Sequence, residues 1–181
     1  MIGYVPQEIA LYDELNTVEN LLFFGKMYHI KRPELRRSID TILEQVGLAD
    51  KRKQPVKQFS GGMKRRLNIA AALLHKPGFI ILDEPTVGID PQSRNRIFEI
   101  VKALKNAGAG VLYITHYMEE AQQLCDRVAI MDGGRIITTD TVTNLLHKAG
   151  NRHMIRVEVD HLHEPDLQQV FLQLTGRNLR D

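Results

Sequence analysis

The chain is organised around one stretch, Phe79-Ile80-Ile81-Leu82-Asp83-Glu84-Pro85-Thr86-Val87-Gly88-Ile89-Asp90. Its first four residues form a short apolar run, which is typical of a strand buried on both faces of a parallel sheet. Such a strand ends at the carboxyl edge of the sheet, where open α/β sheets bind their ligands. The stretch therefore predicts an α/β fold with a functional site directly after Leu82.

Two adjacent carboxylates, Asp83 and Glu84, follow this strand. An aspartate that closes the strand can hold Mg²⁺, directly or through water, and a glutamate one residue later can orient or deprotonate an attacking water. The alternative is that both residues only cap a turn after a core strand. The stretch by itself does not separate the two, so the rest of the chain has to decide.

Composition excludes several classes of protein. The chain has 181 residues, 43% of them hydrophobic and 25% charged, with a formal net charge of +2. A dispersed charge of this size does not predict nucleic-acid binding. The apolar runs are far shorter than the roughly 20 residues that span a bilayer, and no signal peptide opens the chain, so we expect a cytoplasmic protein. Cys125 is the single cysteine and excludes an internal disulfide.

The first half of the chain predicts a strand followed by helices. Met1 to Val5 is expected to be a strand that leads into a loop carrying Gln7, a candidate ligand and otherwise an ordinary surface amide. Asn16 and Glu19 form a capping-box pair that opens a helix running to about residue 28, and a second helix covers residues 33–46. We expect a helical insert here, whose apolar cluster is either core or a docking face for a partner: Phe23, Phe24, Met27, Tyr28 and Ile30.

A second candidate site opens the next helix. Ser60-Gly61-Gly62 precedes an apolar helical pattern that ends near Pro77. Free backbone N–H groups, a hydroxyl and the positive end of the helix dipole meet there without bulky side chains, which favours a phosphate site. A plain serine N-cap with a glycine hinge is the alternative.

The remaining elements alternate as in an α/β protein. Pro91 opens a crossover helix, residues 111–115 form another parallel strand, and His116 follows it on the edge expected to carry Asp83. A short helix over 117–124, a hairpin turning at Asp132-Gly133-Gly134 and a helix over 141–149 come next. The last residues predict a strand over 154–159 and a helix over 167–174. We expect a core strand and loop over 1–14, a helical subdomain over 15–76, the rest of the core over 77–150 and an appendage over 151–181.

Taken in order, these motifs resemble the ATP-binding cassette of ABC transporters, whose core is a P-loop NTPase-like parallel sheet with a helical insert subdomain. The resemblance implies ATP and Mg²⁺ as cofactors and ATP hydrolysis as the activity. By this resemblance the site residues are the Q-loop Gln7, the signature Ser60, Gly61, Gly62 and Met63, the Walker B strand Ile80 to Asp83, the catalytic Glu84, the D-loop Gly88 to Asp90 and the switch histidine His116.

The roles implied by the resemblance divide these residues into three groups. Glu84, His116 and Gln7 would be catalytic, and Asp83 with Gln7 would hold the metal. The signature residues and Asp90 would bind nucleotide, with the signature acting on ATP held by a second cassette. Phe59 and Met63 depart from the commonest signature, and this variant is similar to multidrug- and polysaccharide-export cassettes, as is the ending Val170 to Asp181. The implied partners are a second cassette and a transmembrane permease, which would place the chain at the inner face of the membrane.

One motif of the family does not occur in the 181 residues, the Gly-x-x-x-x-Gly-Lys-Ser/Thr loop that precedes the Q-loop. Two interpretations stay open. The chain is part of an ATPase subunit that powers export, or it is a non-catalytic remnant that binds nucleotide poorly and associates with an intact cassette. A cassette of the DNA-repair kind would need long heptad-bearing arms between Gln7 and Ser60, and the sequence there has none.

Overall fold

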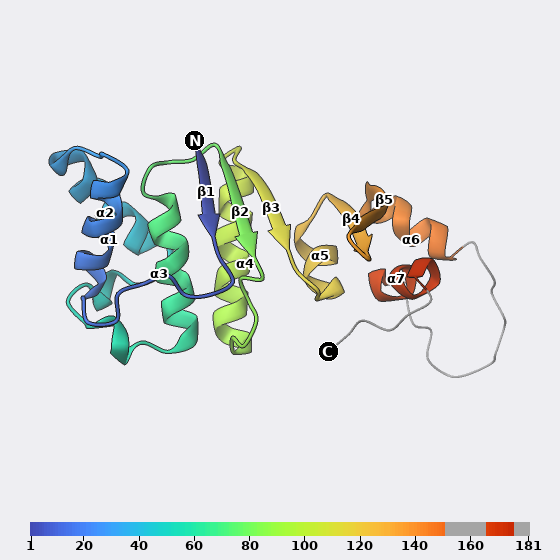
Figure 1. Cartoon of the computed structure of the whole chain (residues 1–181), viewed down its shortest axis with the longest axis horizontal. Helices are drawn as coiled ribbons and strands as arrows, with labels where there is room; N and C mark the ends of the chain where they lie inside the picture. The colour runs from blue at the N-terminus through green and yellow to red at the C-terminus, as the bar shows by residue number, and fades with distance from the viewer. Residues whose placement is uncertain (151–165, 176–181) are drawn as a thin grey trace. The chain divides into compact units, whose positions relative to one another are not determined.

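The computed structural model describes residues 1–150 and 166–175, which belong to two compact units, one over Met1–Ile114 and one that starts at Thr115 (Figure 1). The predicted strand over 154–159 lies outside the described residues.

The first unit contains the parallel sheet. Its strands are β1 (Ile2–Val5), β2 (Phe79–Asp83) and β3 (Gly110–Ile114), in the order β1-β2-β3, and both pairings are parallel. The helices of this unit are α1 (Thr17–Met27), α2 (Arg32–Gln45), α3 (Gly61–Leu73) and α4 (Pro91–Asn106), with two 3₁₀ turns at Ala49–Lys51 and Val56–Gln58. The predicted α/β class and parallel sheet are confirmed.

The helix boundaries follow the local signals in the sequence. The Asn16 side chain accepts from the backbone N–H of Glu19, and the Glu19 side chain accepts from the backbone N–H of Asn16, which completes the expected capping box of α1. Pro33 and Pro91 lie in the first turns of α2 and α4, where a missing N–H costs little. Both helices of the predicted insert are therefore present.

The two faces of the sheet differ, and this corrects one prediction. Helix α3 contacts β1, α4 contacts β3, and the two helices contact each other, so both crossovers lie on one face. On that face Ile80 is 1% and Leu82 is 0% exposed. The other face is open, with Leu112 46% and Ile114 41% exposed. The expectation that the strand Phe79–Leu82 is buried on both faces is wrong, because no described helix of this unit covers the second face.

The second unit has its own small core. It consists of α5 (Met118–Leu124), the antiparallel hairpin of β4 (Arg127–Asp132) and β5 (Arg135–Thr141), α6 (Val142–Gly150) and α7 (Leu167–Thr175). The hairpin turns at Gly133 and Gly134, both with positive φ, as expected for a tight two-residue turn. Ala121, Ile130, Leu145, Leu167 and Val170 form the core, and the half-buried thiol of Cys125 packs against it.

In the described part of the chain, no helix combines the length and the apolarity needed to cross a bilayer.

Candidate functional site

The carboxyl edge of the sheet brings together residues that are far apart in the sequence. Asp83 is the last residue of β2, and Gln7 follows the end of β1 by two residues. The Gln7 side-chain amide Nε2 donates to Oε2 of Glu84 at 2.9 Å, across 77 residues of sequence. The Tyr4 hydroxyl donates to Oδ2 of Asp83 at 3.2 Å. Parallel pairing of β1 with β2 makes both contacts possible, because it aligns the two strand ends.

The backbone of Glu84 is held in an uncommon conformation. Its φ is +43°, a left-handed value that a residue with a Cβ rarely adopts, and its N–H donates to the carbonyl oxygen of Ile114 at 3.0 Å. Strain of this kind persists where the surrounding structure fixes it, and it is common at functional sites. The hydrogen bond to the neighbouring strand β3 thus fixes the backbone of Glu84 at the point where the chain leaves β2.

Donor chemistry at this edge suits Mg²⁺. The Tyr4 hydroxyl donates to Oδ2 of Asp83, and Nε2 of Gln7 donates to Glu84. Oδ1 of Asp83 and Oε1 of Gln7 are therefore the oxygen atoms that can serve as metal ligands. Mg²⁺ prefers oxygen ligands and is bound by one or two carboxylates together with waters and substrate phosphates. Within residues 1–150 and 166–175, no group of three or more His, Cys, Asp and Glu side chains is arranged to hold a metal ion. Asp83 and Gln7 would thus supply two oxygen ligands to Mg²⁺, and its other ligands would be waters and phosphate oxygens.

The predicted nucleotide-binding residues lie at the first turns of α3 and α4. The Ser60 hydroxyl accepts from the Met63 N–H at 3.3 Å, and Oδ1 of Asp90 accepts from the Ser93 N–H at 2.9 Å. The hydrogen bonds from Ser93 lower the pKa of Asp90. Both side chains thus serve as helix N-caps, as the simpler interpretation of Ser60 proposed.

The two signature glycines have different surroundings. A Cβ on Gly62 would lie 2.1 Å from Oγ of Ser93, so glycine is needed there for the close approach of α3 to α4. A Cβ on Gly61 would meet only Cδ1 of Ile89, at 3.7 Å, and Gly61 is exposed. The packing of α3 against α4 therefore explains why residue 62 is glycine. No such packing requires a glycine at position 61, so the exposed Gly61 can face a ligand.

His116 belongs to the second unit. It follows the end of β3 by two residues, and its ring lies 4.2 Å, centroid to centroid, from that of Tyr117. Its expected proximity to Asp83 and Glu84 stays a prediction.

Sequence analysis missed Arg65, which is 4% exposed on α3. Its Nη1 donates to the carbonyl oxygen of Pro6 at 2.7 Å, and its Nη2 donates to that of Gln7. Burial lowers the pKa of Arg65, and the negative charge of Asp83 opposes this shift. The only signal in the sequence is the basic run Lys64-Arg65-Arg66 after the glycines, which does not reveal the partners of the arginine.

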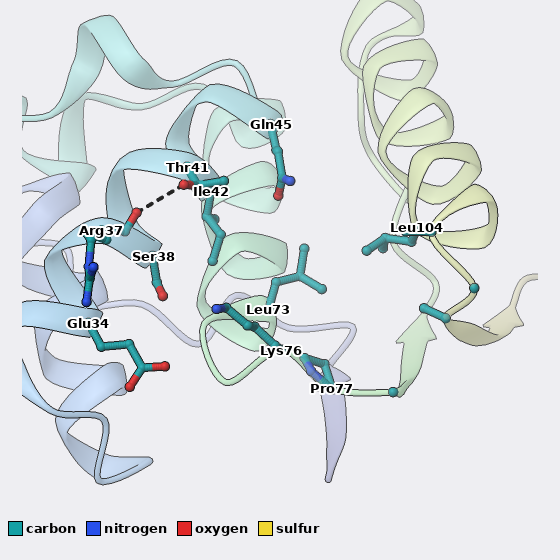
Figure 2. Close-up of a pocket in the computed structure, with 14 residues that line it drawn as sticks. Glu34, Arg37, Ser38, Thr41, Ile42, Gln45, Leu73, Lys76, Pro77 and Leu104 are labelled. Atoms are coloured by element: carbon teal, nitrogen blue, oxygen red, sulfur yellow. Dashed lines mark hydrogen bonds between the residues drawn. The ribbon is translucent and has the colours of Figure 1, made fainter.

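The hollow shown in Figure 2 lies elsewhere. It has a volume of about 770 Å³ and lies between α2, the end of α3 and the end of α4. Gly78 and Ala109, which line it, directly precede β2 and β3, so it opens at the amino ends of the strands. None of the predicted site residues lines it, and open α/β sheets bind ligands at the opposite edge.

The fold is that of an α/β protein, and carboxylate and amide oxygens of Asp83, Glu84 and Gln7 lie at the carboxyl edge of its parallel sheet. Comparison with known proteins specifies the class. The family model described as ABC transporter matches residues 1–87. The linearmycin resistance ATP-binding protein LnrL of Bacillus subtilis (strain 168) is 52% identical over 163 residues, which cover 90% of this chain and 52% of that protein.

Two further comparisons extend over nearly the whole chain. The Nod factor export ATP-binding protein I of Cupriavidus metallidurans is 33% identical, with 99% of this chain and 74% of that protein covered. A solved structure titled as the ATP binding subunit of an ABC transporter is similar with a TM-score of 0.76 and 28% identity, over 96% of this chain and 68% of that one. The chain belongs to the family of ABC transporter ATP-binding proteins. It spans about half the length of LnrL and of another similar protein, the daunorubicin resistance ATP-binding protein DrrA3 of Streptomyces coeruleorubidus.

Proposed function

We propose that this chain is part of an ATP-binding and ATP-hydrolysing subunit of an ABC export transporter, which couples hydrolysis to transport through a separate membrane subunit. The observation that carries the proposal is the contact between Gln7 and Glu84 beside Asp83, which assembles an amide and two carboxylates at the carboxyl edge of a parallel sheet. The names of the similar proteins, which describe resistance and export, support the transport part of the proposal.

Each side chain then has a role that its contacts allow. Glu84 accepts the proton of the attacking water, and the hydrogen bond from the Gln7 amide helps to fix the orientation of its carboxylate. Asp83 and Gln7 hold Mg²⁺, which supplies charge neutralisation on the phosphate groups. His116 contacts the γ-phosphate. Ser60, Gly61, Gly62 and Met63, with Asp90, receive the nucleotide of a second cassette at the helix N-termini, which favour anions.

The proposed contact with the permease is an apolar patch, which consists of the ring cluster of Tyr12, Phe23 and Phe24 together with the exposed Met27 and Tyr28 at the end of α1. The ring of Tyr12 lies 4.7 Å from that of Phe23, edge to face, and Phe23 lies 5.5 Å from Phe24. Met27 is 62% exposed and Tyr12 is 49% exposed. Exposed apolar side chains that gather in this way often mark interaction sites. Through the permease, the subunit would lie at the inner face of the membrane.

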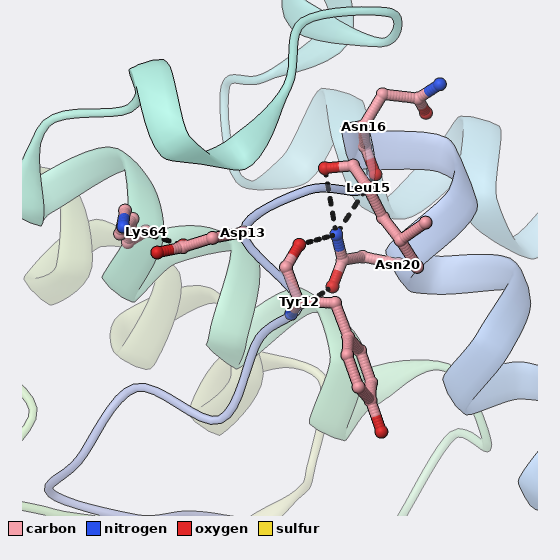
Figure 3. Close-up of polar contacts among 6 residues, drawn as sticks. All are labelled: Tyr12, Asp13, Leu15, Asn16, Asn20 and Lys64. Carbon is pink, nitrogen blue, oxygen red and sulfur yellow. Dashed lines mark hydrogen bonds and ion pairs between the residues drawn. The ribbon is translucent and has the colours of Figure 1, made fainter.

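The loop that carries Gln7 contributes Tyr12 to this patch. Figure 3 shows that the buried Asn20 of α1 forms hydrogen bonds with the part of the loop from Tyr12 to Asn16. Its Oδ1 accepts from the Tyr12 N–H at 2.9 Å, and its Nδ2 donates to the carbonyl oxygens of Tyr12, Leu15 and Asn16. A displacement of the patch by a partner would therefore be transmitted to the loop that positions Gln7.

Replacing Glu84 tests the proposal. The assay uses a restored cassette, in which a segment with a Gly-x-x-x-x-Gly-Lys-Ser/Thr loop precedes Met1. We expect Glu84→Gln to lower the rate of ATP hydrolysis by about 10²- to 10⁴-fold, because the amide keeps the shape of the side chain and cannot accept a proton. Glu44→Gln, on the exposed surface of α2, is the matched control and should leave the rate unchanged.

Two outcomes would count against the proposal. Full activity of Glu84→Gln would move the base elsewhere. A restored wild-type cassette that binds ATP and does not hydrolyse it would count against a catalytic role for these residues.

A further inference from the structure

Two consecutive arginines of α3 make the same kind of contact with different parts of the first unit. Arg65 donates to the carbonyl oxygens of Pro6 and Gln7. Arg66 donates through Nη1 to the carbonyl oxygens of Val46 at 2.8 Å and Gly47 at 3.0 Å, just after α2. The pair offers a built-in comparison, because one arginine reaches the candidate site and the other reaches a helix end.

The contact of Arg65 is made in an unfavourable environment. The residue is 4% exposed, and its Nε is a buried nitrogen without an acceptor among the described residues. Removing a guanidinium from water is costly unless hydrogen bonds and nearby opposite charge offset the loss. Two carbonyl oxygens and the charge of Asp83 provide that offset here. The burial of Arg65 is therefore tied to the position of the Gln7 backbone.

Gln7 connects this arginine to Glu84. Its carbonyl oxygen accepts from Arg65, and its side-chain amide donates to Glu84. The guanidinium is planar and rigid, so two donors on two consecutive carbonyls fix the orientation of the backbone between them as well as its position. Lys64, the preceding residue of α3, forms an ion pair with Asp13 at 2.7 Å, so the same helix holds the loop a second time.

We propose that Arg65 is a positioning residue, which links the helix that begins at Ser60 to Glu84 by fixing the backbone of Gln7. The inference deepens the proposed function and rests on the roles given there to Gln7 and Glu84. A movement of α3 relative to the sheet would shift the Gln7 amide and change how it holds the Glu84 carboxylate. The position of α3 and the orientation of the Glu84 carboxylate would thus be coupled within one chain.

The first test follows the Gln7 side-chain amide by ¹H–¹⁵N NMR on the 181-residue chain. Gln7→Ala assigns the resonance, and Glu84→Ala defines its position without the hydrogen bond. Arg65→Lys keeps the charge and loses the fork that reaches two carbonyls. We expect this substitution to move the resonance toward the Glu84→Ala position. If Arg65→Lys does not fold, Arg65→Gln is the second variant, and it removes the buried charge.

Arg66→Lys is the matched control, with the same change of chemistry one residue away. It should destabilise the chain to a similar degree, as followed by urea unfolding, and leave the Gln7 resonance in place. An unchanged Gln7 resonance in folded Arg65→Lys or Arg65→Gln would overturn the proposal. Equal shifts in the Arg65 and Arg66 variants would do the same, because they would reflect general loosening of α3.

The second test measures ATP hydrolysis by the restored cassette. Arg65→Lys should lower kcat by about tenfold, the usual size of the loss of one charge-assisted hydrogen bond, with little change in KM. In a Gln7→Ala background the same substitution should have no further effect, because residues that act through one another are not additive. Additive losses would overturn the proposal. Inactivity of the restored wild-type cassette would instead count against the proposed function, while the NMR comparison would still decide the role of Arg65.

Discussion

The two faces of the parallel sheet are built from the same kinds of residue and have different surroundings. Leu82 on β2 points toward α3 and α4 and is 0% exposed, whereas Leu112 on the neighbouring β3 belongs to the other face and is 46% exposed. Ile80 and Ile114 differ in the same way, at 1% and 41%. We refer to these surfaces as the covered face and the open face.

The difference teaches that an apolar strand does not determine what covers it. A run such as Phe79–Leu82 places apolar side chains on both faces of a sheet, because successive side chains alternate between the faces. Which face is filled depends on the side to which the crossover helices return. Here both crossovers of the described unit return to one side, so the open face keeps a row of apolar side chains at its surface.

One carboxylate of the candidate site, Asp83, lies on the open face. Asp83 alternates with Leu82 along β2 and therefore shares the face of Phe79 and Ile81, next to Ile114 in the register. The Tyr4 hydroxyl reaches it from β1 on the same face. The covered face thus packs against α3 and α4, and the open face carries the contact between Tyr4 and Asp83.

The largest difference between the faces is expected for truncation of Leu82. Leu82→Ala removes a fully buried side chain between the sheet and its helices, and such changes cost about 2–5 kcal/mol in the free energy of unfolding, because a cavity remains. Urea unfolding followed by circular dichroism measures this change. A loss below about 1 kcal/mol would mean that the covered face is loosely packed and that the comparison is invalid.

A smaller effect is expected for Gly3→Ala, which adds a methyl group to the covered face. The new Cβ would lie 2.9 Å from the carbonyl oxygen of Ala72 and 3.0 Å from Cγ of Pro77. Overpacking of this kind costs roughly 1–3 kcal/mol. Gly78→Ala is the matched control, since no atom lies within 4 Å of its Cβ position, and the same unfolding measurement should find it nearly unchanged. If Gly3→Ala is as stable as the control, α3 can move away from β1 at little cost.

Local signals in the sequence predicted most of the elements and some of the candidate site. The capping box of Asn16 and Glu19, the strand ending at Asp83 and the glycine turn at Gly133 are short-range features, and each is present. The open face could not be predicted, because the side on which α3 and α4 pack is set by the whole unit. Arg65 could not be predicted either, since its acceptors are backbone carbonyls 58 and 59 residues away, and carbonyls leave no mark in a sequence.

The smallest effect is expected for the same truncation on the open face. Leu112→Ala removes a side chain that is already 46% exposed, so less apolar surface returns to water and no closed cavity forms. Full burial of a leucine is worth about 1.5–3 kcal/mol, and a half-exposed one should therefore contribute roughly half of that, about 0.8–1.5 kcal/mol. Unfolding of Leu112→Ala beside Leu82→Ala tests this directly, since both variants lose the same atoms from adjacent strands.

A loss as large as that of Leu82→Ala would show that the open face is buried in solution. The covering surface would then come from outside residues 1–114, and if it came from another copy of the chain, the Tm of the wild type would rise with protein concentration. A Tm independent of concentration together with a small loss would establish that the two faces of one sheet contribute unequally to its stability.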